Sequence, residues 1–267
     1  MVHKYNCKFV RKYNKMKILL SPAKKLDFTK EISKLKDTNI SFVNESRVIM
    51  EKLSSYSALE LSKLMSLSMN LSLLNKERND KWNYPFLKNS AKQSIYSFKG
   101  DVYQKMKIDE FSEEDLKYAN NSIRIISGLY GILKPSDLIL PYRLEMGTKL
   151  EVGKSKNLYF FWKNILTDYL INDIKDDDFL VNLASDEYFK VIDKNKINKP
   201  IISPIFKDTK NGKTKVISFF AKRARGEMCN FIVKNKIKTI DQIKAFNRSG
   251  YTFSENDSSD KSLVFIR

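Results

Sequence analysis

The stretch SGLYGILKPSDLILPYRLEMG, residues 127–147, is the part of the chain whose backbone path the sequence restricts most. It contains three of the eight glycines and two of the six prolines. Glycine permits backbone angles and close approaches that other residues resist, whereas proline fixes φ and removes a hydrogen-bond donor. We therefore expect a tightly specified path here, with Tyr130, Tyr142, Arg143 and Glu145 held in defined positions along it.

The residues that lead into this stretch predict a helix. Ser112 is followed three positions later by Asp115, which approximates a capping box, and apolar residues then recur at helical spacing. Such a helix would end at Gly128, and Gly131 would open the next turn. This order is the outline of a helix-hairpin-helix, whose backbone N–H groups can bind a phosphate. Two residues rather than the usual one separate the glycines and Pro135 limits the second helix, so an ordinary packing corner is the alternative.

Several other segments have helical patterns. Leucine and methionine recur at core spacing through residues 45–74, where Ser57 and Glu60 match a second capping box. Gly100 and the aspartate after it suggest a turn into a short helix. Residues 160–171 predict an amphipathic helix.

Length and composition place the chain among globular proteins with a sizeable core. Its 267 residues allow one large domain or two small ones, and 42% of them are hydrophobic. Charged residues make up 30%, and the mean hydropathy is −0.43. No apolar run approaches the roughly 20 residues of a membrane span, so we expect no transmembrane segment and no membrane partner.

The net charge of +18 and the pI near 9.6 suggest a polyanionic partner such as nucleic acid. Lysine occurs 40 times and arginine 9 times. A chain so rich in lysine, asparagine and isoleucine can also reflect an AT-rich genome rather than selection for charge. Composition leaves both explanations open.

Histidine and cysteine are too scarce for several kinds of site. Cys7 and Cys229 give neither a disulfide framework nor a metal-binding spacing, and a reducing compartment is the default. The single histidine, His3, lies near the terminus, which excludes Ser-His-Asp chemistry and a histidine-ligated metal in the core. We expect no metal and no cofactor, and any catalysis would use Lys, Tyr, Ser, Cys or carboxylates.

Residues 1–15 differ in composition from the rest of the chain. They carry five basic residues and no acid. An organelle-targeting segment is one interpretation. The interpretation we favour is an upstream start codon with Met16 as the natural first residue, which makes residues 16–267 the folded domain.

Polar residues follow two predicted buried strands. Ser21 and Lys24 come after residues 16–20, and Ser185 and Glu187 come after residues 179–184, which include Asn182. Ligands often bind outside the carboxyl ends of strands, so these groups are candidate site residues. Lys24 or Glu187 could act as a general base if burial shifted its pKa. A simple strand exit with solvated side chains is the alternative.

A third basic element follows a predicted hairpin. Residues 201–206 and 213–220 predict two strands, and a helix then begins near Lys222, Arg223 and Arg225. Cations in the first turn oppose the helix dipole, which favours a bound anion there. Arginine, with its planar fork, suits phosphate or carboxylate better than lysine does. A solvated basic face remains the alternative.

Six strings of this sequence, in order, resemble the bacterial YaaA family of peroxide-stress proteins. They are SPAK at residues 21–24, FKGDVY at 98–103, SGLYG at 127–131, PYRLEMG at 141–147, NLASDEYF at 182–189 and AKRARG at 221–226. The resemblance implies a single-domain α+β fold: a mixed sheet flanked by helices, a basic cleft and a helix-hairpin-helix-like element. It also implies a cytoplasmic protein that binds duplex or branched DNA and limits oxidative damage to DNA by lowering free intracellular iron. The site residues that it carries over are Ser21, Lys24, Gly128, Tyr130, Gly131, Tyr142, Arg143, Asn182, Ser185, Glu187, Tyr188, Lys222, Arg223 and Arg225.

Two functional hypotheses follow. The leading one is a DNA-binding stress protein whose lysines and arginines contact phosphates without reading bases. The alternative is an enzyme that acts on a nucleotide or another small anionic ligand, because Glu145, Glu187 and Tyr142 are not needed for DNA binding. Neither the preferred DNA structure nor the oligomeric state follows from the sequence.

Overall fold

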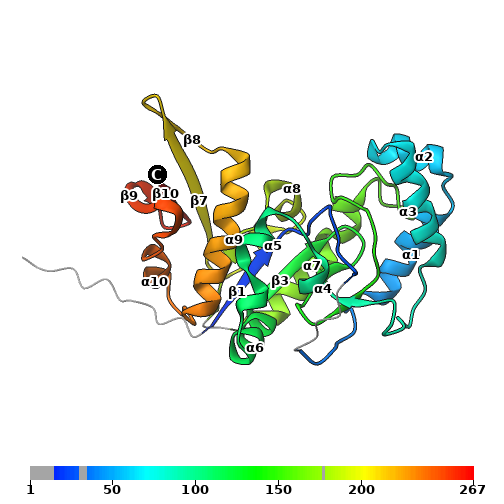
Figure 1. The fold of residues 1–267 in the computed structure, drawn as a ribbon, viewed down its shortest axis with the longest axis horizontal. Helices are drawn as coiled ribbons and strands as arrows, with labels where there is room; N and C mark the ends of the chain where they lie inside the picture. The colour runs from blue at the N-terminus through cyan, green and yellow to red at the C-terminus, as the bar shows by residue number, and fades with distance from the viewer. Residues whose placement is uncertain (1–14, 30–34, 176–177) are drawn as a thin grey trace, which may run out of the picture.

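An eight-stranded mixed sheet runs through the middle of the molecule (Figure 1). The computed structural model describes residues 15–29, 35–175 and 178–267. Within these ranges the strands follow one another as β4, β3, β1, β6, β7, β10 and β9, and β8 pairs with the end of β7. Their bounds are β1 Lys15–Leu20, β3 Ile123–Ser127, β4 Gly131–Leu133, β6 Asp178–Asn182, β7 Ile201–Lys210, β8 Lys213–Lys215, β9 Thr252–Ser259 and β10 Ser262–Ile266. Two further strands, β2 Lys92–Gln93 and β5 Leu138–Ile139, pair separately.

The five central strands are parallel. β1 pairs in parallel with β3 and β6, and β7 pairs in parallel with β6 and β10. Every residue of β3 and β6 is buried, as expected for strands covered on both faces. The carboxyl ends of β3, β1 and β6 therefore meet at one edge of the sheet, and this edge positions the candidate site.

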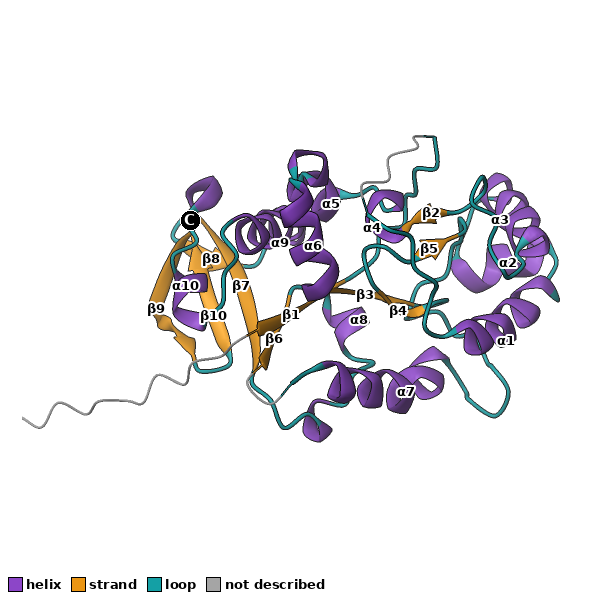
Figure 2. Ribbon diagram, turned by 90° about the horizontal axis from the view of Figure 1, so that it is seen from below, coloured by secondary structure: helices purple, strands orange, loops and turns teal. Residues whose placement is uncertain are grey.

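Helices cover both faces of the sheet (Figure 2). Helices α5, α6 and α9 lie on one side, with α6 on β1 and α9 on β7, whereas α7 lies on the other side. Helices α1, α2 and α3 pack together at the far end of the molecule. The described helices are α1 Val43–Ser54, α2 Ala58–Met65, α3 Met69–Lys81, α4 Ser94–Ser97, α5 Asp101–Met106, α6 Glu113–Ser122, α7 Leu158–Asp173, α8 Asp186–Phe189, α9 Ser218–Lys234 and α10 Ile240–Lys244.

The expected α+β architecture, a mixed sheet flanked by helices, is confirmed. Capping boxes form at Ser57 with Glu60 and at Ser112 with Asp115, as the sequence predicts. None of the described helices is both long and apolar enough to cross a membrane. The expectation for residues 1–15 falls almost entirely outside the described ranges, which begin at Lys15.

The helix-hairpin-helix outline is corrected by the structure. Helix α6 ends at Ser122, and the next five residues form β3 instead of continuing the helix to Gly128. Gly131 then opens β4, which pairs antiparallel with β3, so the two glycines flank the turn of a β-hairpin. The isoleucines of β3 favour a strand because β1 and β4 border them on both sides and all of them are buried.

The glycines of this turn are needed for packing. Gly131 has a positive φ of 70°, and a Cβ there would lie 2.8 Å from the ring of Phe42 and 2.9 Å from that of Trp162. The Trp162 indole, fully buried in α7, donates its N–H to the carbonyl of Gly128 at 2.9 Å. The β3–β4 turn is thus fixed against α7.

A buried ion pair ties the sheet to the end of α7. Arg124 of β3 donates two hydrogen bonds to the Asp173 carboxylate, at 2.8 and 3.0 Å. Lys17 of β1 reaches the same carboxylate at 3.1 Å. Burial and the nearby guanidinium lower the pKa of Lys17. Removing Asp173 would leave two poorly solvated cations unpaired, so this carboxylate is structural.

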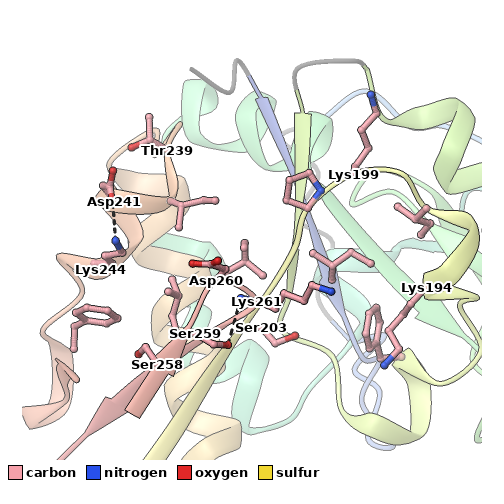
Figure 3. Close-up of a pocket in the computed structure, with 18 of the residues that line it drawn as sticks. Lys194, Lys199, Ser203, Thr239, Asp241, Lys244, Ser258, Ser259, Asp260 and Lys261 are labelled. Atoms are coloured by element: carbon pink, nitrogen blue, oxygen red, sulfur yellow. Dashed lines mark hydrogen bonds and ion pairs between the residues drawn. The ribbon is translucent and has the colours of Figure 1, made fainter. Parts of the chain in front are cut away.

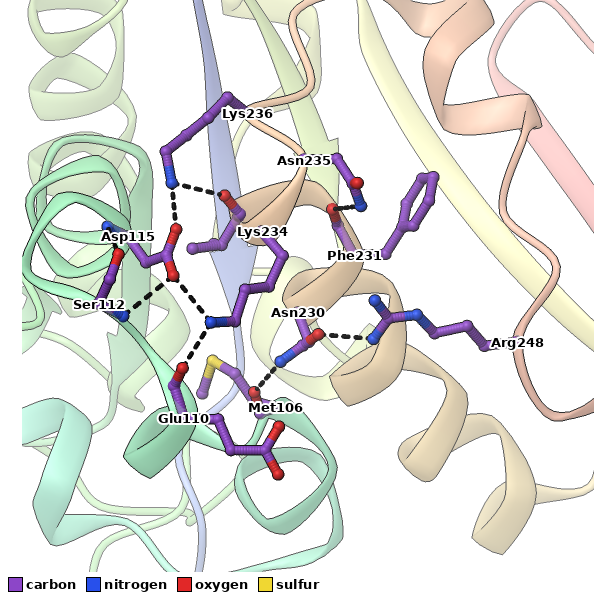
Figure 4. A network of polar contacts seen from close by, with 11 residues as sticks. Met106, Glu110, Ser112, Asp115, Asn230, Phe231, Lys234, Asn235, Lys236 and Arg248 are labelled. Carbon is purple, nitrogen blue, oxygen red and sulfur yellow. Dashed lines mark hydrogen bonds and ion pairs between the residues drawn. The ribbon is translucent and has the colours of Figure 1, made fainter.

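Helix α9 is held by a polar network to α5 and α6 (Figure 4). The Asp115 carboxylate of α6 accepts hydrogen bonds from Lys234, at 2.9 Å, and from Lys236. Asn230 donates to the carbonyl of Met106 at 2.7 Å and accepts from Arg248. Gly226 allows α9 to approach α5 closely, because a Cβ there would collide with the carbonyl of Val102.

Helix α9 also begins earlier than the sequence suggests. The predicted strand 213–220 ends at Lys215, and α9 begins at Ser218. Lys222, Arg223 and Arg225 therefore lie in the second helical turn, and the argument from the helix dipole, which acts mainly on the first turn, loses its force.

Candidate functional site

Residues that follow β1 and β6 meet at the carboxyl edge of the sheet. The backbone N–H of Ser185 donates to Ser21 Oγ at 2.9 Å, and the two hydroxyl oxygens lie 3.2 Å apart. Tyr103 of α5 donates its hydroxyl to the carbonyl of Ser21 at 2.9 Å. We call the group assembled here the strand-end cluster: Ser21, Lys24, Tyr103, Ser127, Tyr142, Arg143, Glu145, Ser185, Asp186, Glu187, Tyr188 and Arg225.

Buried tyrosines supply uncharged hydroxyls to this cluster. The hydroxyl oxygen of Tyr142 lies 2.8 Å from Ser127 Oγ, at the end of β3. Burial raises the pKa of Tyr103, Tyr142 and Tyr188, and the nearby phenols and carboxylates reinforce the effect for Tyr103 and Tyr188. All three therefore remain protonated at neutral pH and can act as hydrogen-bond donors.

The segment 141–147 crosses over the strand ends and is fixed there by two glycines. A Cβ on Gly128 would lie 2.7 Å from the carbonyl oxygen of Leu144, so only glycine allows the segment to pass so close to the end of β3. The N–H of Gly147 donates to Glu187 Oε1 at 3.0 Å. Glu187 is thus half-buried and hydrogen-bonded.

Glu145 joins two of the predicted cations. Its carboxylate lies 2.7 Å from Lys24 Nζ and 3.1 Å from an Nη atom of Arg143. Arg143 also points one guanidinium N–H toward the carbonyl of Lys24, at 3.5 Å. Its Nε atom is buried and has no hydrogen-bond partner among the described residues.

Arg225 reaches the cluster from α9. Asp186, which follows Ser185, is its electrostatic neighbour, and Gly226 beside it contacts α5 just before Tyr103. Burial lowers the pKa of Arg225, although its guanidinium remains charged at neutral pH. Within the described ranges, no side chain or backbone group hydrogen-bonds or ion-pairs with it.

The strand-end cluster is not a basic cleft. Its three cations, Lys24, Arg143 and Arg225, are matched by three carboxylates, those of Glu145, Asp186 and Glu187. At this edge the charged side chains therefore balance, and six hydroxyl groups, from three serines and three tyrosines, accompany them. Such a composition is typical of a small-molecule site rather than of a surface for a polyanion.

Lys222 and Arg223 lie elsewhere. Lys222 is exposed, and the Arg223 guanidinium stacks over the ring of Phe219 at 5.4 Å. Both belong to residues 209–223, which we call the basic segment and which span the tip of the β7–β8 hairpin and the start of α9. The structure thus separates predicted residues that the sequence treats as one site.

Four other predicted residues serve the fold. Gly128, Tyr130 and Gly131 are buried, and the N–H of Tyr130 donates to Ser127 Oγ at 3.0 Å. The Tyr130 hydroxyl accepts from Trp82 and donates to the carbonyl of Leu140. Asn182 accepts the N–H of Ala184 at 3.0 Å and shapes the exit from β6. Backbone donors of the glycine turn are therefore not presented to a ligand.

Ser127 and Asp186 are two members of the strand-end cluster that the sequence alone does not indicate as site residues. Ser127 is one of many serines, and only the pairing of β3 with β1 brings it to the cluster. The signal that could have found it is its position directly before a glycine at a strand end.

A spacious cavity of about 960 Å³ lies on a different part of the sheet, beside the start of β7 (Figure 3). Its lining mixes the lysines Lys194, Lys199, Lys244 and Lys261 with apolar groups, and Lys244 pairs with Asp241 at 2.7 Å. It contains none of the residues that the sequence singled out. Among the described residues, no group of three or more His, Cys, Asp or Glu side chains is arranged to hold a metal ion.

Comparison with known proteins identifies relatives along almost the whole chain. The family model described as peroxide stress protein YaaA matches residues 16–257. A UPF0246 protein of Flavobacterium psychrophilum is 48% identical over 252 residues, which cover 94% of this chain and 100% of that protein. UPF0246 proteins of Flavobacterium johnsoniae and Colwellia psychrerythraea are 47% and 46% identical, over 94% of this chain and 100% and 99% of their own lengths.

Proposed function

The chain belongs to the YaaA family of peroxide-stress proteins, and from this premise we propose that it binds the phosphate backbone of duplex or branched DNA through the basic segment. The observation that carries the proposal is the charge of this segment. Residues 209–223 contain five cations and no carboxylate, and no ion pair joins those cations to another described residue. Surface cations that pair with no carboxylate remain available to bind the phosphates of a polyanion.

The shape and composition of the basic segment support the same proposal. The β7–β8 hairpin projects beyond the other strands, next to the start of α9 (Figure 1). Val216, Phe219 and Phe220 are 51%, 50% and 36% exposed within it. Aromatic side chains between cations are common in nucleic-acid surfaces, where rings contact bases or sugars and cations contact phosphates. Nothing in the segment favours one base sequence, so we propose binding without base-specific readout.

Lys24 and Arg143 are excluded from this interface because Glu145 already pairs with both. Physiologically, we propose that DNA binding limits oxidative damage during peroxide stress, together with a fall in free intracellular iron. The proposed effect on iron is tested by measuring chelatable iron in peroxide-treated cells that contain or lack the protein. Equal iron in both would remove that part of the proposal and leave DNA binding untouched.

DNA binding is tested with the double variant Lys222→Gln/Arg223→Gln. Its affinity for duplex and for four-way-junction DNA is compared with that of the unchanged protein. Losing two phosphate contacts should weaken binding by about tenfold or more near 100 mM salt. The matched control is Lys52→Gln with Lys63→Gln, two exposed lysines on α1 and α2 at the opposite end of the molecule (Figure 1). Equal affinity for all three proteins would refute the basic segment as the DNA surface.

A further inference from the structure

We infer that the strand-end cluster is a second binding site, separate from the basic segment, for a small ligand that carries a phosphomonoester group. Two cationic groups there have hydrogen-bonding capacity that the fold does not use. The Arg225 guanidinium has no hydrogen-bond partner among the described residues, and neither does the buried Nε of Arg143.

Arg225 is only partly hydrated in the absence of a ligand. The side chain is half-buried, which removes part of the hydration of its guanidinium, and an acceptor normally compensates that loss. Close packing of Gly226 against Val102 keeps Arg225 in this position, and the Asp115 and Asn230 contacts hold α9 in place. The helix thus holds the half-buried guanidinium near Asp186, with no hydrogen bond or ion pair to a described residue. Its planar fork matches the oxygens of a phosphate.

The hydroxyl groups of Ser185 and Ser21, beside Asp186, add further donors for an anion. Ser185 precedes Asp186, the electrostatic neighbour of Arg225, and bonds to Ser21. Either hydroxyl of the Ser21–Ser185 pair could be the donor, so one proton of the pair is available to an incoming oxygen. The guanidinium and the hydroxyls together provide donors from the residue that follows β1, the N-cap of α8 and α9.

The balance of charge favours a small ligand over a DNA backbone. Glu145 and Glu187 would repel a polyanion that passed over the whole cluster. A compact phosphomonoester needs only the part beside Arg225, because Glu145 is engaged by Lys24 and Arg143. The phosphate could belong to a free nucleotide or to the terminus of a DNA strand, and both present the same group.

The test titrates the full chain with inorganic phosphate, with nucleoside monophosphates, and with short oligonucleotides with or without a 5′-phosphate. Binding is followed by calorimetry and by backbone amide chemical shifts. We expect saturable binding that shifts the amides of Ser21, Ser185 and Arg225. A preference for the monophosphate over the oligonucleotide identifies a free nucleotide, and the reverse preference identifies a strand terminus. No saturable binding, or shifts confined to other lysine-rich surfaces, would overturn the inference.

Variants separate this site from the DNA surface. Arg225→Gln should weaken phosphate binding by about tenfold or more, since a charge-assisted hydrogen bond is lost. Lys222→Gln, an exposed cation on the same helix, should leave phosphate binding unchanged. If the double variant Lys222→Gln/Arg223→Gln loses DNA binding but retains phosphate binding, the two sites are independent. If Arg225→Gln binds phosphate as tightly as the unchanged protein, Arg225 has no role. If that variant does not fold, the amide shifts of the unchanged protein decide alone.

Discussion

Single residues in the segment 141–147 and its contacts show how the fold builds the strand-end cluster. Glycine at position 128 makes room for the carbonyl of Leu144, and this close passage places Tyr142, Arg143 and Glu145 over the strand ends. The geometry of the cluster thus depends on the lack of a side chain at Gly128 as much as on its charged side chains.

Gly128→Ala should therefore destabilise the protein. The added Cβ would lie 2.7 Å from a backbone oxygen, which can move only if the segment 141–147 moves with it. We expect the free energy of unfolding to fall by about 1–3 kcal/mol, as in overpacked cores. Urea unfolding measures the change. Gly147→Ala is the control, because its Cβ would meet the movable Glu187 side chain at 3.1 Å. Equal stability of the two variants would contradict the assigned role of Gly128.

At this scale, the sequence predicted residue types better than their partners. Ser21, Ser185, Lys24 and Glu187 were singled out by position after buried strands, and the structure brings all four to one edge. It could not predict that Glu145 pairs with both Lys24 and Arg143. The pairing with Lys24 depends on how segments more than 100 residues apart pack, and short-range spacing carries no such information.

Among elements, α9 is the one on which both proposed sites depend. Its first two turns carry part of the basic segment and Arg225, while its last turn is anchored by Asp115. Partial burial raises the pKa of Asp115, but hydrogen bonds from Lys236 and Lys234 outweigh this and lower the pKa below its ordinary range. The anchor is thus a carboxylate that is more acidic in the folded state than in the unfolded state.

The stabilisation from Asp115 should depend on pH. A lowered folded-state pKa means that the contribution is complete above the unfolded pKa of about 3.9 and is lost as the pH falls toward the folded value. We expect Asp115→Asn to cost about 1–3 kcal/mol near neutral pH. The difference from the unchanged protein should shrink between about pH 4 and pH 2. Unfolding at a series of pH values measures it.

The control for this anchor is Asp241→Asn, whose carboxylate is 66% exposed and pairs with Lys244 only one turn away. An exposed pair of this kind contributes little, so the variant should stay within about 0.5 kcal/mol at every pH. A pH-independent effect of Asp115→Asn would show that packing, not charge, holds the end of α9.

Element types were predicted well where the pattern had one interpretation and poorly where it had two. The capped helices α2 and α6 and the buried strands β1 and β6 agree with the sequence. Residues 123–127 fit helical spacing and a buried strand equally, and tertiary contacts with β1 decided for the strand. The polar residues 254–259 have the composition of a turn, yet they form most of β9 because β10 supplies a pairing partner.

For the whole molecule, the question is what the net charge of +18 does. If composition bias produced it, the lysines spread over the surface would contribute no specific contacts. If the basic segment binds DNA, only its five cations should release counterions, because only they meet phosphates. The salt dependence of binding separates these cases, since it counts contacts rather than total charge.

We expect the logarithm of the DNA-binding constant to fall with the logarithm of salt concentration at a slope of roughly −4 to −5, about −0.9 for each of five phosphate contacts. Lys213→Gln with Lys215→Gln, in the hairpin, should make the slope shallower by about 1.8. Lys52→Gln with Lys63→Gln removes the same charge at the other end of the molecule and should leave the slope unchanged. A slope that responds equally to both pairs would mean that total charge, and not the projecting hairpin, attracts the DNA. The basic segment would then lose its distinct role as the DNA surface.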